Sequence, residues 1–125
     1  MKVYLAGPIE ICSDDEVHIW RDYVCDRVPE HIEIIQPIYH LGTAEDIFVN
    51  TKSNVEECDI VFAYLPKCIN ERRASYGTIF EISYGFALGK KVFIISDDEY
   101  VQSHPVMKGA TTEYYHCIDS ALLAL

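Results

Sequence analysis

The amino-acid sequence predicts an α/β fold in which helices cover both faces of a parallel sheet. Two short apolar runs of buried-strand length, residues 59–65 and 92–95, flank a helical pattern that begins near Ser75 and ends near Gly89. Strand, helix and strand in this order form a βαβ unit, whose crossover is right-handed. Strand-like and helical patterns alternate along the rest of the chain at intervals of about 25 residues, which is typical of a doubly wound sheet.

The other elements follow from periodicity and from turn and cap signals. Gly7-Pro8 ends the first strand, and Ser13 followed by three acids is typical of a helix start. Residues 43–46 could begin one helix, and residues 53–57 resemble a separate second one. In chain order the sequence predicts a strand at 2–6, a helix at 13–28, a strand at 31–35, an ambiguous segment at 41–57, a strand at 59–65, a helix at 75–88, a strand at 92–95, a short helix from 96 that Pro105 ends, a strand at 113–117 and a helix at 118–125.

The composition is that of a single domain spanning residues 1–125, with 50% hydrophobic and 24% charged residues. No apolar run reaches the length of a membrane span, and residues 1–5 resemble a strand and not a signal peptide. The five cysteines are scattered without C-x-x-C pairs, which favours reduced thiols and a cytoplasmic location. The net charge of −10 makes nucleic acids and anionic membranes poor partners.

Two loops of the predicted sheet are placed to bind a ligand. In doubly wound sheets, ligands bind beyond the carboxyl ends of the strands, where the strand order reverses. Residues 7–9 follow the first strand there, and residues 66–77 follow the third. Tyr4 stands near the end of the first strand, and Glu81 lies in the second turn of the helix after the second loop. We therefore expect Tyr4 and Glu81 to face each other across one crevice.

Glu81 is an acid on a helix that is apolar over most of its circumference. An ionised carboxylate in such surroundings is costly unless a neighbouring group compensates for it. The N-terminus of the helix supplies part of that compensation and favours the anion, which is the form that acts as a nucleophile. The alternative is that Glu81 occupies a narrow solvent-exposed stripe.

A carboxylate with a hydroxyl partner suits covalent chemistry at a sugar carbon, since the chain has neither a metal-ligand cluster nor a dinucleotide fingerprint. In retaining glycosyl chemistry a carboxylate attacks the anomeric carbon and a second group assists the leaving group. Tyr4 could orient Glu81, although a tyrosine in a strand is more often structural. Ser75 is as easily explained as a helix cap. Of the five histidines, only His104 lies in a loop that could reach a site.

Five stretches of the sequence together resemble a known family. They are VYLAGPI at 3–9, WRDY at 20–23, CDIV at 58–61, SYGTIFE at 75–81 and GKKV at 89–92, and they cover most of the chain in order. The most specific feature is the S-x-G-T-x-x-E pattern that ends at Glu81. With these stretches the sequence resembles the nucleoside 2-deoxyribosyltransferase family, whose superfamily also contains deoxynucleoside 5′-monophosphate N-glycosidases.

The resemblance implies a flavodoxin-like sheet of five parallel strands, no cofactor, and a deoxynucleoside and a free nucleobase as ligands. It makes Glu81 the nucleophile that forms a deoxyribosyl ester and Tyr4 the residue that orients it. It also implies a homo-oligomer built from dimers, in which a loop of the neighbouring subunit completes each pocket. The residues expected to contact substrate are Gly7, Pro8, Ile9, Thr51, Asn54, Ser75, Gly77 and, from the neighbour, His104.

One position departs from the family pattern. The family carries an aspartate eight residues before the acid that begins the third strand, and this aspartate handles protons on the leaving base. Counting back from Asp59 gives Thr51. A threonine can hydrogen-bond a base but is no general acid near neutral pH. Either a nearby acid such as Asp46 replaces it, or the leaving group is activated less.

The function expected from these observations is transfer of 2-deoxyribose between nucleobases. One alternative is a hydrolase of deoxynucleosides or their 5′-monophosphates, in which Arg72 and Arg73 would hold the phosphate. The acidic, glycine-free loop at residues 10–16 disfavours a phosphate group. A second alternative is a non-catalytic nucleoside-binding module, in which the missing aspartate marks lost chemistry.

Overall fold

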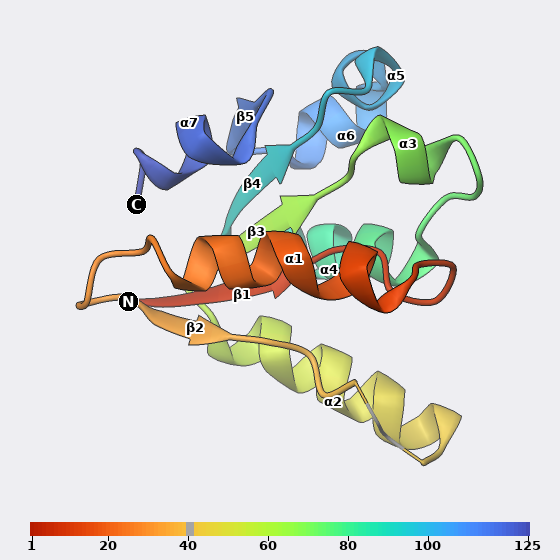
Figure 1. The fold of residues 1–125 in the computed structure, drawn as a ribbon, viewed down its shortest axis with the longest axis vertical. Coiled ribbons are helices and arrows are strands. Elements are labelled where there is room, and N and C mark those ends of the chain that lie inside the picture. The colour runs from red at the N-terminus through yellow and green to blue at the C-terminus, as the bar shows by residue number, and fades with distance from the viewer. Residues whose placement is uncertain (40–41) are drawn as a thin grey trace.

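The computed structural model describes residues 1–39 and 42–125, so His40 and Leu41, where the ambiguous segment begins, lie outside the described residues. The described chain alternates strands and helices around one sheet (Figure 1). The elements are β1 (Lys2–Ala6), α1 (Asp14–Cys25), β2 (Glu33–Ile35), α2 (Ala44–Glu57), β3 (Ile60–Tyr64), α3 (Lys67–Asn70), α4 (Tyr76–Ala87), β4 (Lys91–Ile95), α5 (Glu99–Ser103), α6 (Pro105–Ala110), β5 (Glu113–Tyr115) and α7 (Ile118–Leu122).

The sheet has five parallel strands in the order β2-β1-β3-β4-β5. Tyr4 of β1 lies opposite Val61 of β3, which in turn lies opposite Val92 of β4. This order is that of flavodoxin-like folds, in which the strand order reverses between β1 and β3. The predicted fold class is therefore confirmed.

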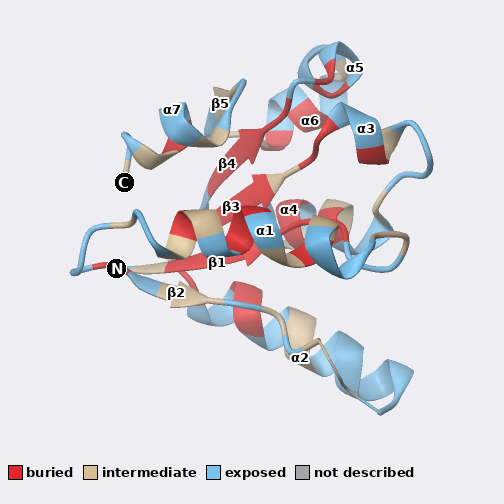
Figure 2. Ribbon diagram, in the orientation of Figure 1, coloured by how far each residue is buried: buried red, intermediate tan, exposed pale blue. Residues whose placement is uncertain are grey.

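Alternating side chains of the central strands build a core on each face of the sheet. One core joins the strands to α1 and α7, through Trp20 and Ala121 among others. The opposite core joins them to α2, α4, α5 and α6, for example through Val55, Ile82 and Met107. In Figure 2 the central strands are almost entirely buried, whereas the N-terminal half of α2 is exposed.

Local cap signals set the helices around the sheet as the sequence predicts. Ser13 and Glu16 form a reciprocal capping box at the start of α1. Ser75 caps α4 by accepting a hydrogen bond from the amide of Thr78. Gly89 after α4 has a φ of 74°, a conformation that glycine adopts without strain.

Helix α2 is the main difference from the sequence-based expectation. The two short helices predicted for this region are one continuous helix, Ala44–Glu57, which Thr43 caps. Ser53 and Asn54 resemble a second helix start because such residues favour caps, but both lie inside α2. Thr51 is likewise in the helix interior and is not a cap.

Several boundaries also differ. β2 is shorter than residues 31–35, because Ile32 forms a turn hydrogen bond to Pro29 before it enters the core. β5 ends at Tyr115 and α7 at Leu122, both earlier than predicted. The sequence analysis missed α3 entirely, and it missed α6, in which Pro105 ends one helix and begins the next.

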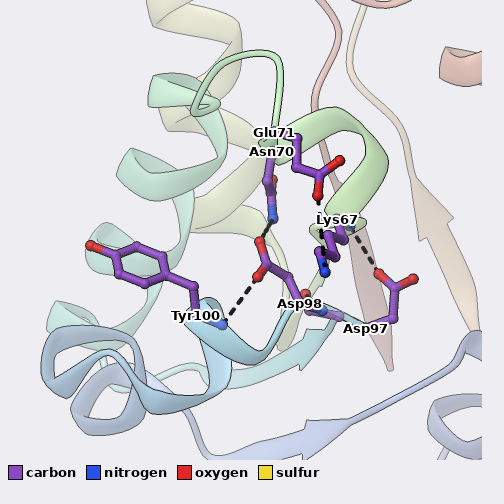
Figure 3. A network of polar contacts seen from close by, with 7 residues as sticks. Lys67, Asn70, Glu71, Asp97, Asp98 and Tyr100 are labelled. Carbon is purple, nitrogen blue, oxygen red and sulfur yellow. Dashed lines mark hydrogen bonds and ion pairs between the residues drawn. The ribbon is translucent and has the colours of Figure 1, made fainter.

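A polar network joins the loop after β3 to the loop after β4 (Figure 3). The amide of Lys67 donates to Asp97 Oδ1 at 2.8 Å, and Asn70 Nδ2 donates to Asp98 Oδ2 at 3.1 Å. Asp98 also accepts from the amide of Tyr100 at 3.0 Å, which caps α5. These bonds fix α3 at the carboxyl edge of the sheet, and α3 leads into the segment that reaches the pocket.

The described residues contain neither a membrane-spanning helix nor a cluster of metal ligands. No helix within residues 1–39 and 42–125 combines the length and the apolar character needed to cross a bilayer. In the same part of the chain, no three His, Cys, Asp or Glu side chains gather closely enough to hold a metal ion.

Candidate active site

A pocket of about 370 Å³ opens beyond the carboxyl end of β1, where the strand order reverses. Its walls come from the loops after β1 and β2, from α2, and from the start of α4 with the residues before it. The lining residues are Tyr4, Gly7, Pro8, Ile9, Glu10, Ile11, Pro37, Ile38, Tyr39, Ile47, Asn50, Thr51, Arg73, Ala74, Ser75, Tyr76, Gly77, Thr78 and Glu81. The sequence rule for doubly wound sheets thus predicts the position of the pocket correctly.

Tyr4 and Glu81 form a buried pair at this pocket. Their side chains are 1% and 5% exposed, and the Tyr4 hydroxyl donates a short hydrogen bond to Glu81 Oε2. The prediction that the two residues face each other is confirmed. The alternative that Glu81 lies on a solvent-exposed stripe is wrong.

Burial raises the pKa of Glu81 to about 7, although the Tyr4 hydrogen bond and the charge of Arg21 both lower it. Desolvation therefore outweighs the favourable contacts, so the charge of Glu81 is only partly compensated, in line with the partial compensation that the sequence predicts. Near neutral pH the carboxyl group passes readily between its charged and neutral forms. A group with this property can attack as an anion and depart as a leaving group.

The Tyr4 hydroxyl remains protonated over the whole physiological range. Burial raises its pKa strongly, and the negative charge of Glu81 raises it further. Tyr4 is therefore a hydrogen-bond donor to Glu81 and not a base. A hydrogen bond with the Asn54 side chain opposes these effects and lowers the pKa of Tyr4.

Arg21 is a residue near this site that the sequence analysis did not single out. Its side chain is 0% exposed on α1, and its charge lowers the pKa of both Glu81 and Tyr4. A signal existed in the sequence, because Arg21 follows Val17 by four residues and precedes Val24 by three. That spacing places a charged residue on the buried face of the helix.

The α2 wall presents one amide and one hydroxyl to the pocket, beside the apolar Ile47, and no carboxyl group. Thr51 lines the pocket, as expected for the base-contacting position. Asn50 lines it as well, and its Oδ1 accepts from the Ile38 amide and from Asn54 Nδ2, both at 3.2 Å. Asn54 itself lies behind the lining residues and is buried, so it supports the wall. Asp46 is exposed in the first turn of α2 and is not a lining residue.

The remaining predicted residues divide into two groups. Gly7, Pro8, Ile9, Ser75 and Gly77 all line the pocket, and the Ser75 hydroxyl lies 2.7 Å from that of Thr78. His104 does not line it. Its Nδ1 accepts from the Val106 amide at 3.2 Å and caps α6. That a neighbouring subunit supplies His104 stays a prediction.

Two arginines near the pocket are already paired with acids. Arg73 lines the pocket and lies 3.1 Å from Glu10, which lines it too. Arg72 forms a short ion pair with Glu16 and also donates to the Ile11 carbonyl at 3.4 Å. Both acids belong to the loop that follows β1 and the start of α1, so the positive charge at this edge is neutralised within the chain.

The strand order and the pocket at its reversal point define a flavodoxin-like α/β protein with a buried carboxylate at its ligand site. The sequence profile of the nucleoside 2-deoxyribosyltransferase family matches residues 3–119, and the chain belongs to this family. The resemblance noted in the sequence is thereby confirmed. No protein of curated function matches the chain by sequence.

Several solved structures share the fold of this chain. A 2-desoxiribosyltransferase from Leishmania mexicana aligns over 98% of this chain and 95% of its own, with a TM-score of 0.78 and 20% identity. A 2-deoxyribosyltransferase from Bacillus psychrosaccharolyticus aligns over 98% and 90%, with a TM-score of 0.71 and 18% identity. A CMP N-glycosidase from Clostridium botulinum aligns over 99% and 97%, with a TM-score of 0.66 and 19% identity. At these identities the similarity shows the fold.

Proposed function

We propose that this protein transfers 2-deoxyribose between nucleobases through a covalent glycosyl ester on Glu81. The observation that carries the proposal is the Tyr4–Glu81 pair, in which a buried carboxyl group faces a ligand-sized pocket while a phenol holds one of its oxygens. Membership of the nucleoside 2-deoxyribosyltransferase family supports the class of reaction.

The reaction proceeds in two displacements at one carbon. First, an oxygen of ionised Glu81 bonds to the anomeric carbon, while the bond to the base nitrogen breaks and its electron pair leaves with the base. A nitrogen of a second base then attacks the same carbon, the ester C–O bond breaks, and Glu81 recovers its charge. The departing base gains one proton and the incoming base loses one, so the overall exchange is balanced.

Tyr4 orients the nucleophile in this scheme. Its hydrogen bond to Oε2 fixes the plane of the carboxylate and leaves Oε1 free of that bond. It also stabilises the anion, which lowers the pKa of Glu81. Since the nucleophile must be ionised, kcat/KM rises with pH through about 7, the pKa of Glu81.

The leaving base departs with little acid assistance from the α2 wall. Counted along the sequence, Thr51 stands where the family pattern has its aspartate. Thr51 and Asn50 both line the pocket, and both are neutral. Both can hydrogen-bond a base without transferring a proton near neutral pH. Turnover is therefore slow for bases that must be protonated to leave.

We also propose that unphosphorylated deoxynucleosides are preferred over their 5′-monophosphates. The pocket edge offers Arg73 only as a partner of Glu10, and Arg72 only as a partner of Glu16. A phosphate would have to displace an acid from each arginine before it gained a charge-assisted bond. The comparison of kcat/KM for deoxycytidine and deoxycytidine monophosphate at low salt tests this preference, and equal use of the monophosphate contradicts it.

Incubation with deoxyadenosine, with and without free cytosine, separates the candidate functions. Formation of deoxycytidine supports transfer. Release of adenine without an acceptor supports hydrolysis, in which water replaces the second base. Binding without turnover supports the non-catalytic module and refutes the proposed chemistry. The Glu81→Gln variant is the matched control, since it keeps the size of the side chain and removes the nucleophile.

A further inference from the structure

Arg21 is a fully buried cation at the edge of the pocket. Nη1 donates to the Val17 carbonyl at 2.7 Å, and Nη2 donates to the Gly7 carbonyl at 3.2 Å. Within residues 1–39 and 42–125, its buried Nε has no hydrogen-bond partner and its guanidinium forms no ion pair with a carboxylate. Burying a cation in this way carries a large desolvation cost.

The guanidinium contacts two aromatic rings and one wall of the pocket. Its central carbon lies 4.4 Å from the Trp20 ring centroid and 5.8 Å from that of Tyr39. Tyr39 and Gly7 both line the pocket. A Cβ at Gly7 would lie 2.7 Å from Trp20 and 3.4 Å from Arg21 Nη2, so the loop after β1 packs tightly against this pair.

Arg21 also acts on Glu81 at a distance. Its charge lowers the pKa of Glu81 and of Tyr4, and the negative charge of ionised Glu81 raises the pKa of Arg21 in return. Desolvation remains the largest effect on Arg21 itself and lowers its pKa. The attraction between Arg21 and Glu81 therefore offsets part of the cost of burying each of them.

We propose that Arg21 is a positioning residue of the active site, one that holds the Gly7 and Tyr39 walls and places a buried, unpaired positive charge beside the pocket that the Tyr4–Glu81 pair lines. This inference deepens the proposed function. Only its kinetic test depends on that function, because the titration of Glu81 can be measured without activity. Arg21 is not a lining residue, so it acts through Gly7, Tyr39 and Glu81.

Other ionisable groups near Glu81 cannot take over this electrostatic role. Tyr4 stays protonated and neutral, and burial raises the pKa of the Cys58 thiol to about 11, which keeps it neutral too. At the pocket mouth, Arg73 is paired with Glu10, so these two charges largely cancel. The α1 side of the site thus supplies the unpaired positive charge.

The test is the titration of the Glu81 carboxyl group in Arg21 variants. Carboxyl carbon NMR follows this titration directly, and the Glu81 signal is assigned by its loss in Glu81→Gln. We expect Arg21→Gln to raise the proton affinity of Glu81 by about threefold to tenfold, equivalent to roughly half to one pH unit. Arg21→Lys keeps the charge and should titrate close to wild type. The control is Arg27→Gln, an exposed arginine just beyond the end of the same helix.

Kinetics provide a second readout. The rising limb of the kcat/KM profile should move to higher pH in Arg21→Gln and return to the wild-type position in Arg21→Lys. A purely structural role would lower the rate equally at every pH.

An unchanged Glu81 titration in Arg21→Gln overturns the proposal even if the protein has no transferase activity. Should Arg21→Gln not fold, Arg21→Met fills the same space and carries the test. Failure of both neutral variants to fold, with Arg21→Lys folded, assigns Arg21 to stability and also overturns the proposal.

Discussion

Replacing Glu81 by glutamine should abolish turnover and also stabilise the folded protein above pH 7. Turnover is lost because the nucleophile is removed, and stability is gained because a poorly solvated charge is removed. Glu81 is 5% exposed, and burial raises its pKa from 4.5 to about 7. Glutamine keeps the shape and the capacity to accept from Tyr4, and it carries no charge.

The sign and the size follow from proton linkage. Below pH 4.5 the carboxyl group is protonated in both the folded and the unfolded chain, and burial costs no charge. As the pH rises through about 7, the folded protein must bury an anion that the unfolded chain exposes to water. The contribution of Glu81 to stability is thus present at low pH and lost at high pH. A rise from 4.5 to about 7 corresponds to roughly 3 kcal/mol at about 1.4 kcal/mol per pH unit.

Urea unfolding of wild type and Glu81→Gln at about pH 4, 6 and 8 measures this loss. The difference between their free energies of unfolding isolates Glu81, because all other ionisable groups contribute equally to both proteins. The free energy of unfolding of Glu81→Gln, relative to that of wild type, should increase by about 3 kcal/mol from pH 4 to pH 8. Glu30→Gln, at an exposed site, is the control and should show no such trend. A difference between wild type and Glu81→Gln that does not vary with pH would refute the reasoning.

Three further changes test other parts of the site and the fold. Tyr4→Phe removes the donor to Glu81, so activity at pH 7 should fall by about tenfold or more and recover partly in alkali, as a pH–rate profile would reveal. Thr51→Asp restores a carboxyl group in the pocket wall and should speed release of adenine by up to about a hundredfold; unaltered kinetics would place proton handling elsewhere. Gly85→Ala sets a Cβ 2.7 Å from Val61 and should cost about 1–3 kcal/mol in thermal unfolding, and an unchanged midpoint would mean that α4 shifts freely on the sheet.

The parts of the fold that the sequence predicts are those in which local and tertiary preferences agree. β1, β3 and β4 are buried on both faces, so their apolar runs are unmistakable. Helix α4 begins at a serine cap and ends before a glycine with positive φ, and its bounds are nearly those predicted. The edge strands β2 and β5 are harder to predict from sequence. They are short and half-exposed, so their pattern of apolar residues is weaker.

Helix α2 shows why the other regions could not be predicted. Its exposed N-terminal half has apolar residues such as Phe48, and its interior has cap-type residues such as Ser53 and Asn54. Locally these features indicate a break. The helix continues because Asn54 finds a partner in Asn50 and because Val55 packs into the core, and neither contact is visible in a local window.

In the candidate site, the sequence predicts the Tyr4–Glu81 pair but not the buried Arg21 near it. Glu81 stands out because an acid interrupts an apolar helix, and the position rule for doubly wound sheets brings Tyr4 to it. Arg21 interrupts an apolar face in the same way, on α1. It was overlooked because its contact with the site depends on the approach of α1 to the loop after β1, through the Gly7 carbonyl.

The positions of Arg21 and Glu81 show how two buried charges from different layers of the fold can lie near the same pocket. Helix α1 covers one face of the sheet and α4 covers the other, so the two charges belong to opposite layers of the fold. The sheet lies between these two layers except beyond the ends of its strands. β1 ends at Ala6, and Gly7 follows without a side chain, which lets Trp20 and Arg21 approach the loop closely. Each charge alone would be costly to bury in its own core, whereas near the switch point the attraction between them offsets part of that cost, and the pKa of Glu81 lies at about 7.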